Sequence, residues 1–465
     1  MRDSIINILM LPSKYLNIRT ILCLILLTIG NVYGEVELSN SVKRAILNSK
    51  HDISLTFQKY FRLNKPQTSG TSSNQFLLSY YNNNDILRMD SSLMYFQEVK
   101  NFSFSIPEFY IKTMKKDFYI SIGRKIIPWH INEQFWQLGH LNGLRSYTLN
   151  DDKQEGLTGV YIGKNLNKNL KLNFFISGLY IPQLNPGFDS KNGEIQNRTD
   201  WGVVRPTEVP INNIKTSIKY NINEQNILDI VIQKSLGLRL TYNNDDIEFS
   251  GFFIYKPESK LRINVDASLV GTTLTANTIP EVNHHLVSGI ESKIHFGKQL
   301  FVFGIVDINP FASIGSDLDR LTIKLREQKA FKYEYFAYKA NFENERYIHS
   351  SYYFSNSFLS GNISAIYYLT KHNEGNDTFS TSAVKWTKAI GFSLKKDLLD
   401  WWKIYGSLRY DFSKSDNVLN VENLFTYKKI NLLIGLQLLK SPNDNSYWSS
   451  FRTNDSIYTN LTYRF

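Results

Sequence analysis

Apolar and polar residues alternate along most of the chain, from about residue 52 to its end. In the stretch 260–269, every odd position is apolar and every even position is polar or charged. The stretches 403–412 and 456–465 repeat the pattern. Because successive side chains of a strand point to opposite faces, this period of two predicts β-strands with one apolar and one polar face.

Similar stretches occur throughout the chain, and we expect about 16 to 20 strands in all. Most are 9–13 residues long, which is the length that a tilted strand needs to cross the hydrocarbon layer of a membrane. The further candidate strands lie near 52–63, 85–95, 99–112, 117–127, 156–163, 169–181, 213–222, 226–234, 246–256, 285–296, 299–308, 332–340, 346–355, 358–370, 382–394 and 430–440.

The number of strands favours a closed barrel over an open sheet. An open sheet of so many long strands would leave edges that invite aggregation, and backbone groups in lipid must all be paired. We therefore predict an all-β transmembrane protein, an antiparallel up-and-down β-barrel of about 16–18 strands with apolar residues outside and polar residues inside. Stretches rich in Pro, Gly, Asn or Asp predict long extracellular loops at 128–155, 182–212 and 309–329.

The N-terminal segment has the features of a secretory signal peptide. Lys14 and Arg19 precede an apolar run at 21–29, and small residues ending at Gly34 form a plausible cleavage site. A membrane anchor that stays attached is the alternative interpretation. The predicted organisation is a signal peptide at 1–34, a short periplasmic lead-in at 35–50 and an outer-membrane β-barrel at 51–465.

The C-terminal strand is informative because its apolar face ends on an aromatic residue. Ile457, Leu461, Tyr463 and Phe465 share this face. Such a strand is typical of bacterial outer-membrane barrels, so we expect Tyr463 and Phe465 to act as an assembly signal. The expected location is the outer membrane of a Gram-negative bacterium. The expected partners are outer-membrane lipid, lipopolysaccharide, periplasmic chaperones and the barrel-assembly machinery.

Composition is compatible with a barrel and argues against nucleic acid as a partner. Aromatic residues make up 14% of the chain, which suits the girdles at two membrane interfaces, although an A/T-rich genome would also raise the content of Tyr and Phe. The net charge of +11 is not gathered into basic runs or a nucleic-acid-binding motif. The single cysteine, Cys23, lies in the predicted signal peptide, so no disulfide is expected in the mature protein.

The polar faces of the most regular strands carry more positive than negative charge. Ten Lys or Arg residues and four Asp or Glu residues are expected to face the lumen. This excess would concentrate anions and repel cations. Alternatively, the cations pair with carboxylates and with water in the lumen. Besides Lys256 and Arg464, these ten basic residues include eight of the pore-lining candidates, and the segment 121–144 adds Arg124 and Lys125. The pore-lining candidates are Arg124, Lys125, Lys171, Lys215, Lys219, Lys260, Arg262, Lys293, Lys403 and Arg409.

The segment 121–144 begins S-I-G-R-K-I-I-P-W-H and continues as a long loop. A strand that ends in Gly-Arg, followed by a Trp that leads into a long loop, resembles a hairpin of porin-like outer-membrane barrels, including the group related to alginate-export channels. The resemblance covers only this segment. It implies a barrel fold, passive or substrate-guided transport, and a position for Arg124 and Lys125 at the pore rim. The pair Pro128-Trp129 departs from the more polar pair expected there, so the resemblance does not identify the solute.

Two positions are possible for this loop. It either folds inward and narrows the lumen or lies over the mouth of the barrel, with Trp129 in the aromatic girdle. If the loop folds inward, Trp and Arg side chains would guide sugars by stacking and hydrogen bonding. The constriction-loop candidates are Trp129, Trp136 and His140.

Patterns for catalysis and metal binding are weak. His349 and Ser351 share one strand face, as an acyl-hydrolysing pair would, but this face is expected to point into the lumen. His284 and His285 are adjacent and therefore point to opposite faces of a strand. We expect no catalytic residue, no cofactor and no metal site.

Together these patterns predict a porin-like channel for passive diffusion of small hydrophilic solutes, with a preference for anions. The channel is expected to be a monomer or a homo-oligomer such as a trimer. A plugged structural or adhesion barrel whose loops bind a partner is the first alternative. An outer-membrane barrel lipase or deacylase is the least favoured one.

Overall fold

The computed structural model of the 465-residue chain describes most of the region from residue 51 to the C-terminus. The predicted signal peptide and lead-in, 1–50, lie outside the described residues, as does nearly all of the predicted loop 309–329. The described residues are 51–63, 72–83, 86–97, 101–146, 152–182, 188–191, 194–197, 208–211, 214–222, 225–259, 261–270, 273–310, 332–338, 344–356, 358–370, 384–443, 446–451 and 454–465.

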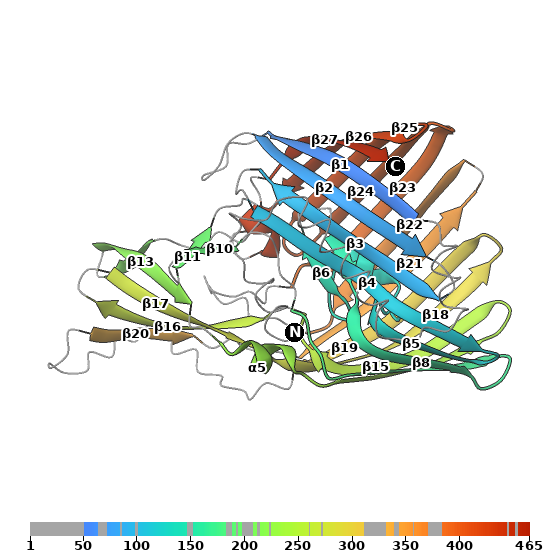
Figure 1. Cartoon of the computed structure of the whole chain (residues 1–465), viewed down its shortest axis with the longest axis horizontal. Coiled ribbons are helices and arrows are strands. Elements are labelled where there is room, and N and C mark those ends of the chain that lie inside the picture. The colour runs from blue at the N-terminus through green and yellow to red at the C-terminus, as the bar shows by residue number, and fades with distance from the viewer. Residues whose placement is uncertain are drawn as a thin grey trace, which may run out of the picture.

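Eighteen antiparallel strands form one closed barrel (Figure 1). Each strand pairs with the next barrel strand along the chain, and the last strand, β27, pairs with the first, β1, from Ser54↔Arg464 to Arg62↔Ser456. The predicted all-β, up-and-down barrel is therefore confirmed. The barrel strands are β1 (His51–Arg62), β2 (Ser72–Asn83), β3 (Leu87–Phe96), β4 (Asn101–Lys115), β5 (Phe118–Lys125), β8 (Leu157–Asn165), β9 (Leu170–Ser177), β14 (Ser235–Asn243), β15 (Ile247–Pro257), β18 (His284–Phe296), β19 (Gln299–Pro310), β21 (Glu345–Ser355), β22 (Leu359–Tyr368), β23 (Lys388–Leu399), β24 (Trp402–Asp411), β25 (Asp416–Tyr427), β26 (Ile430–Lys440) and β27 (Ser456–Arg464).

The two ends of the barrel differ in how their strands are connected. At one end the connections are tight turns, such as Lys116-Asp117 between β4 and β5 and Lys428-Lys429 between β25 and β26. Lys116 and Lys428 have positive φ values of 51° and 50°, as the twisted turns of two-residue hairpins require. The long connections all lie at the other end. In transmembrane barrels the short turns are periplasmic and the long loops extracellular.

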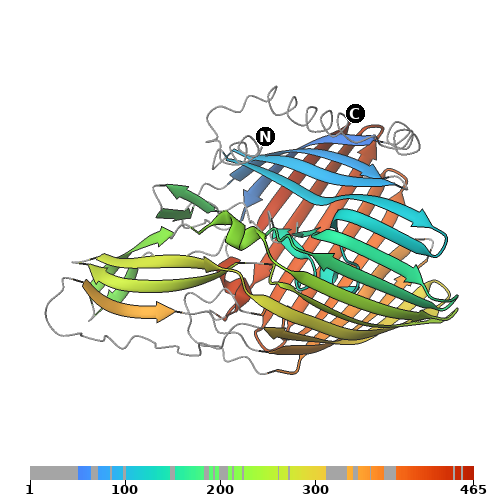
Figure 2. The ribbon, with the colours of Figure 1, turned by 60° about the horizontal axis from the view of Figure 1, so that its bottom comes forward.

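A second, seven-stranded sheet projects from the long-loop end (Figures 1 and 2). It includes a parallel pair, β13 and β17. Strand β13 belongs to the connection between β9 and β14, and β17 belongs to the connection between β15 and β18. Its strands are β10 (Phe188–Lys191), β11 (Glu194–Asn197), β12 (Glu208–Ile211), β13 (Ile214–Ile222), β16 (Arg262–Val270), β17 (Thr273–Glu281) and β20 (Lys332–Tyr338).

Three of the strands expected in the barrel belong to this second sheet, and one of them is the stretch 332–340, which forms β20. The stretch 260–269, which has the most regular alternation, forms most of β16, and the stretch 213–222 forms β13. Alternation identifies a strand with one apolar face, but it does not specify the sheet that the strand joins. The expected strand at 226–234 is also wrong, since a short helix, α5 (Ile227–Val231), occupies it and the barrel strand β14 follows. Asn226 caps this helix by accepting a hydrogen bond from the Leu228 N–H.

The outer surface of the barrel is apolar. On β1, Ile53, Leu55 and Phe61 are exposed, whereas the alternate residues Thr56 and Gln58 are buried on the inner face. On β27, Ile457, Leu461 and Tyr463 are likewise exposed. An outward apolar band around a closed barrel is the surface that lipid requires, and this agrees with the expected location in the outer membrane. As for helices, none among the described residues has the length and apolar character to cross a membrane.

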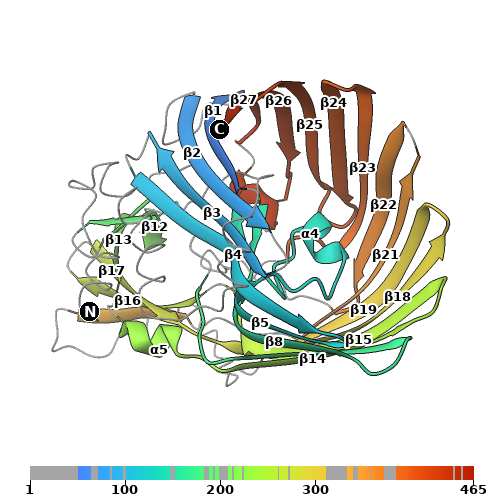
Figure 3. The ribbon, with the colours of Figure 1, turned by 45° about the vertical axis from the view of Figure 1, so that its right-hand side comes forward.

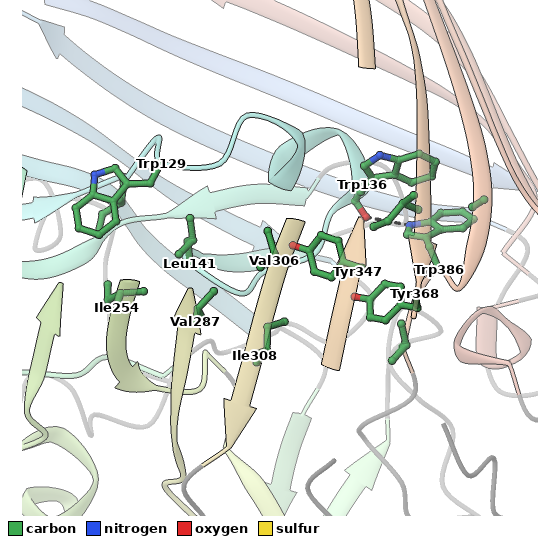
Figure 4. Packing of buried hydrophobic residues seen from close by; sticks show 14 of the residues in the cluster. Trp129, Trp136, Leu141, Ile254, Val287, Val306, Ile308, Tyr347, Tyr368 and Trp386 are labelled. Carbon is green, nitrogen blue, oxygen red and sulfur yellow. Dashed lines mark hydrogen bonds between the residues drawn. The ribbon is translucent and has the colours of Figure 1, made fainter. Parts of the chain in front are cut away.

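The inner face is not uniformly polar, which corrects one expectation. Toward the long-loop end, inward side chains such as Val287, Ile308 and Tyr347 are apolar and buried (Figure 4). They pack against Trp136 and Leu141 of a segment that lies inside the barrel. The alternation therefore continues, but part of the inner face forms a hydrophobic core with this segment instead of meeting water.

The seam that closes the barrel provides a test of packing. The ring of Tyr458 on β27 stacks on Tyr60 of β1 and lies directly over Gly435 of β26, where a Cβ atom would overlap with it. We predict that Gly435→Ala displaces this ring and lowers the free energy of unfolding by about 1–3 kcal/mol, the usual effect of overpacking. Denaturant unfolding in lipid vesicles, followed by the heat-dependent gel shift, measures the change.

Gly406→Ala on β24 is the matched control, because nothing lies within 4 Å of the added Cβ there. We expect this variant to unfold like the unchanged protein. Equal unfolding of the two variants would contradict the packing argument.

Candidate functional site

The loop after β5, residues 126–142, folds into the barrel interior, and its short helix α4 (Asn132–Trp136) lies inside the lumen (Figure 3). Asn142 ties the two arms of the loop together, because its side chain accepts a hydrogen bond from the Ile127 N–H and donates one to the Ile127 carbonyl. The helix ends at Gln137, which has a left-handed conformation with φ 54°. We call residues 126–142 the inner loop.

Hydrogen bonds within the inner loop hold its turn. The Glu133 carboxylate accepts from the N–H groups of Leu141 at 2.6 Å and Asn142 at 3.1 Å. Burial raises the pKa of Glu133 to about 6, and the charge of His130 and these N–H groups limit the rise. Burial, followed by the positive charge of Lys256, lowers the pKa of His140 to about 3, so His140 is neutral at physiological pH.

Polar side chains anchor the inner loop to one side of the barrel wall. His130 lies 3.0 Å from Glu291 of β18, and the Asn132 side chain lies 2.8 Å from His349 of β21. The indole N–H of Trp136 donates to Ser364 of β22 at 2.8 Å. Because these contacts reach three neighbouring or near-neighbouring wall strands, the inner loop is a fixed part of the lumen.

A cluster of aromatic residues also holds the inner loop against this side of the barrel wall. Trp136 is fully buried and packs edge-on against Trp386, whose indole N–H donates to the Trp136 carbonyl at 2.9 Å (Figure 4). Trp386 in turn packs on Trp448 of η1 (Tyr447–Phe451). Trp129 is also buried and lies near Phe252 of β15.

The two inner-loop tryptophans therefore pack inside the protein. Trp129 is not in an outer girdle, and neither Trp129 nor Trp136 has a face open for stacking on a sugar. His140 lies at the end of the inner loop, with Tyr368 3.5 Å from its ring nitrogen. These three candidates thus lie on a loop inside the lumen and help to hold it in place.

On another part of the wall, three lysines surround one tyrosine. The Nζ atoms of Lys112 on β4, Lys125 on β5 and Lys171 on β9 lie 5.4, 5.2 and 5.6 Å from the centre of the Tyr119 ring. Tyr110 and Tyr161 also lie below Lys125, at 5.2 and 5.5 Å. We call Lys112, Lys125 and Lys171 the lysine cluster; within the described part of the chain, no ion pair to a carboxylate is recorded for any of them. Aromatic faces attract cations, which helps like charges to lie close together.

Other candidates on the barrel wall have acidic or aromatic partners. Arg124 pairs with Glu155 at 3.1 Å, and Lys293 pairs with Glu248 at 2.8 Å. Lys403 lies 3.8 Å from Asp397, with both side chains well exposed. Arg409 is buried beneath the inner loop, 5.1 Å from the centre of the Phe135 ring.

The remaining candidates lie away from the barrel wall or outside the described residues. Lys215 and Lys219 are exposed on β13, and Arg262 begins β16, so all three belong to the second sheet. Lys260 lies outside the described residues. Tyr463 and Phe465 are exposed at the short-turn end, where the Phe465 N–H donates to the Ile53 carbonyl.

Sequence reasoning missed several residues that the structure brings together. Lys112 was not singled out, although its place one strand away from Lys125 follows from the β4–β5 hairpin. Asn132 was not singled out either. Glu291 was one of the four acidic residues expected to face the lumen, but its pairing with His130 was not predicted, because the two residues are far apart along the chain. His349 and Ser351 do face inward, but the Ser351 hydroxyl bonds to Asn132 and Ser364 and not to His349, so the pair does not form a nucleophile–base contact.

Deletion of the tip of the inner loop tests its role in the lumen. We predict that replacing residues 131–140 with two glycines increases single-channel conductance severalfold, because the segment occupies part of the water-filled cross-section. Planar-bilayer recordings measure this. Trp401→Ala is the control, since Trp401 is exposed at a short turn away from the lumen; unchanged conductance after the deletion would mean that the inner loop does not limit flow.

Several solved structures are similar to this chain. They include OccK11 (OpdR) of Pseudomonas aeruginosa, with a TM-score of 0.45 and 8% identity over 90% of this chain and 96% of that one. OccAB3 of Acinetobacter baumannii has a TM-score of 0.44 and 10% identity over 90% and 99%. OccK2 (OpdF) of Pseudomonas aeruginosa, in complex with glucuronate, has a TM-score of 0.44 and 8% identity over 90% and 96%.

No family model and no curated relative matches the sequence. The similarity to solved structures therefore concerns the fold. The closed wall of 18 paired strands confirms the barrel fold that the resemblance implied.

Proposed function

We propose that the protein is an outer-membrane channel for passive diffusion of small hydrophilic solutes and that it prefers anions. The lysine cluster is the observation that supports the preference most directly. Three positive charges lie around Tyr119 on the lumen side of β4, β5 and β9, whereas wall cations such as Arg124 and Lys293 pair with carboxylates. A region of unbalanced positive charge in a narrow passage attracts anions, and the surrounding wall of low dielectric strengthens the field.

The position of the inner loop favours a channel that filters solutes over a barrel that is plugged. It is anchored to the side formed by β18, β21 and β22, whereas the lysine cluster lies on β4, β5 and β9. A solute that passes the inner loop would therefore meet the lysine cluster. A plugged adhesion barrel is the alternative, and the second sheet at the long-loop end favours it, since such a sheet offers a surface for a partner. Complete absence of conductance in the purified protein would support that alternative.

The proposed setting includes the partners expected from the sequence. Outer-membrane lipid and lipopolysaccharide would contact the apolar outer band, and chaperones and the assembly machinery would act before insertion. A homo-oligomer is part of the proposal as well. The structure contains one chain, and the wall closes within that chain.

Removal of the lysine cluster tests the preference for anions. We predict that the unchanged channel is anion-selective in a KCl gradient and that the triple variant Lys112→Gln, Lys125→Gln, Lys171→Gln has a severalfold lower permeability ratio of chloride to potassium. The preference should weaken near 1 M salt, where the screening length is about 3 Å. Reversal potentials in planar bilayers measure the ratio.

A matched variant removes the same charge elsewhere. Lys115, Lys168 and Lys298 are exposed at the short-turn end, and their replacement by Gln should change the ratio much less. Cation selectivity in the unchanged channel, or equal effects of the two triple variants, would contradict the proposal.

The C-terminal residue tests the proposed assembly signal. Phe465 is exposed and its described ring contact is with Tyr463, so Phe465→Ala should leave the stability of the folded barrel within about 0.5 kcal/mol. We predict that the variant nevertheless reaches the outer membrane in severalfold lower amounts. Membrane fractionation measures assembly, and refolding of the purified variant measures stability. Normal amounts in the membrane would show that the terminal ring is not needed for assembly.

A further inference from the structure

Two histidines and a glutamate meet where the inner loop touches the barrel wall. His130 comes from the inner loop, Glu291 from β18 and His349 from β21, and all three are buried. One ligand atom from each lies within 4.8 Å of the others, and Glu291 Oε2 is 3.0 Å from His130 Nδ1 and 4.0 Å from His349 Nε2. We propose that this cluster is a binding site for one divalent transition-metal ion, such as Zn²⁺, which joins the inner loop to the wall.

The wall brings two of the three ligands together through strand register. Glu291 pairs with Gly304 of β19, and Gly304 pairs with His349, so the three residues form one row across three strands. The His349 ring extends over Gly304 toward Glu291, and a Cβ atom at position 304 would overlap with its Nε2. A residue with a side chain at this position would block the approach. Glycine therefore makes the close approach of the two ligands possible.

The cluster contains buried polar atoms without a hydrogen-bond partner among the described residues. They are Nε2 of His130, Nε2 of His349 and Oε1 of Glu291, although Lys293 Nζ lies 3.5 Å from the last. Buried polar atoms are normally satisfied, and each exception costs free energy or serves a ligand. Imidazole nitrogens and carboxylate oxygens are ligands that Zn²⁺ takes, and a site with three protein ligands keeps a fourth position for water.

Asn132 can support the metal-bound form of His349. A histidine that binds a metal through Nε2 donates its Nδ1–H to a neighbouring acceptor. The Asn132 side chain lies 2.8 Å from His349 Nδ1, and its other end contacts the hydroxyls of Ser351 and Tyr353 at 2.8 Å each. Hydroxyl groups both donate and accept, so the Asn132 amide can turn over and present its oxygen to His349 without losing these contacts.

The alternative is a metal-free contact of the same residues. In that case Glu291 acts only as a buried anion that accepts from His130 and from the Ile131 N–H, at 3.0 and 3.2 Å. The metal site is independent of the proposed channel function, because it concerns the attachment of the inner loop and is measured by binding.

Titration of the purified, EDTA-treated barrel in detergent with Zn²⁺ tests the proposal. Calorimetry should give one Zn²⁺ per chain, and Co²⁺ should give the visible absorption bands of a tetrahedral site. His349→Gln and Glu291→Gln should each weaken binding about a hundredfold or more, and Asn132→Ala should weaken it about 10–100-fold. His295→Gln is the matched control, since His295 is exposed at the end of β18, and it should bind like the unchanged protein.

A second measurement covers variants that fold poorly. The heat-dependent gel shift first establishes that each variant forms a barrel. Zn²⁺ should then raise the unfolding temperature of the unchanged protein and of His295→Gln but not that of Glu291→Gln, because a ligand that binds only the folded state stabilises it. Absence of stoichiometric binding in the folded unchanged protein would overturn the metal site and leave the metal-free contact. The same holds if His349→Gln and Glu291→Gln bind Zn²⁺ as tightly as the unchanged protein.

Discussion

Pairing between the first and last barrel strands is the constraint on which the rest of the structure depends. Every backbone N–H and C=O in the hydrocarbon layer needs a partner, and a sheet meets that requirement only when its two edges pair with each other. Here β1 and β27 pair over nine residue pairs, and the inward Tyr60 and Tyr458 stack across the seam. Once the wall is closed, each strand residue faces either lipid or the interior.

The closed wall then turns the interior into the place where sequence-distant residues meet. The inner loop enters from β5 and contacts residues more than 150 positions later, such as Glu291 and His349. Its apolar residues bury part of the inner wall, which explains why Val287, Val306 and Tyr347 point inward without meeting water. The interior of this barrel is thus divided into a packed side and a side that carries the lysine cluster, which has no ion pair with a carboxylate in the described part of the chain.

Much of the fold could be predicted because alternation is a local property. The stretches 403–412 and 456–465 form β24 and β27 with the predicted faces. The strands β2 and β25 were not predicted, since apolar neighbours such as Leu77-Leu78 in β2 obscure the period of two. Sheet membership also escaped prediction: 260–269 is as regular as any barrel strand, but its partners are β17 and β20.

The candidate site was less predictable than the fold, because its contacts are not local. Lys171 was expected in the lumen from its strand face and Lys125 at the pore rim from the resemblance to porin-like barrels. Their convergence on Tyr119 depends on the order of β4, β5, β8 and β9 around the wall. The position of the inner loop depends on partners such as Ser364, which the sequence around Trp136 does not reveal. The sequence therefore predicted which charged side chains of the barrel strands face the lumen. Which of these charges a carboxylate neutralises could be seen only in the three-dimensional structure.

The division of the interior has a consequence for how such a channel is built. The groups that hold the inner loop, from His130 to Trp136, contact β18, β21 and β22, whereas the lysine cluster lies on β4, β5 and β9. A charge buried in an anchor needs an opposite charge or a hydrogen-bond partner, because an unpaired buried charge is costly, whereas a charge that attracts solutes must stay unneutralised and near water. These requirements conflict within one set of residues. Placing them on separate strands satisfies both, so in the proposed channel the inner loop would set the width of the passage and the lysine cluster its charge.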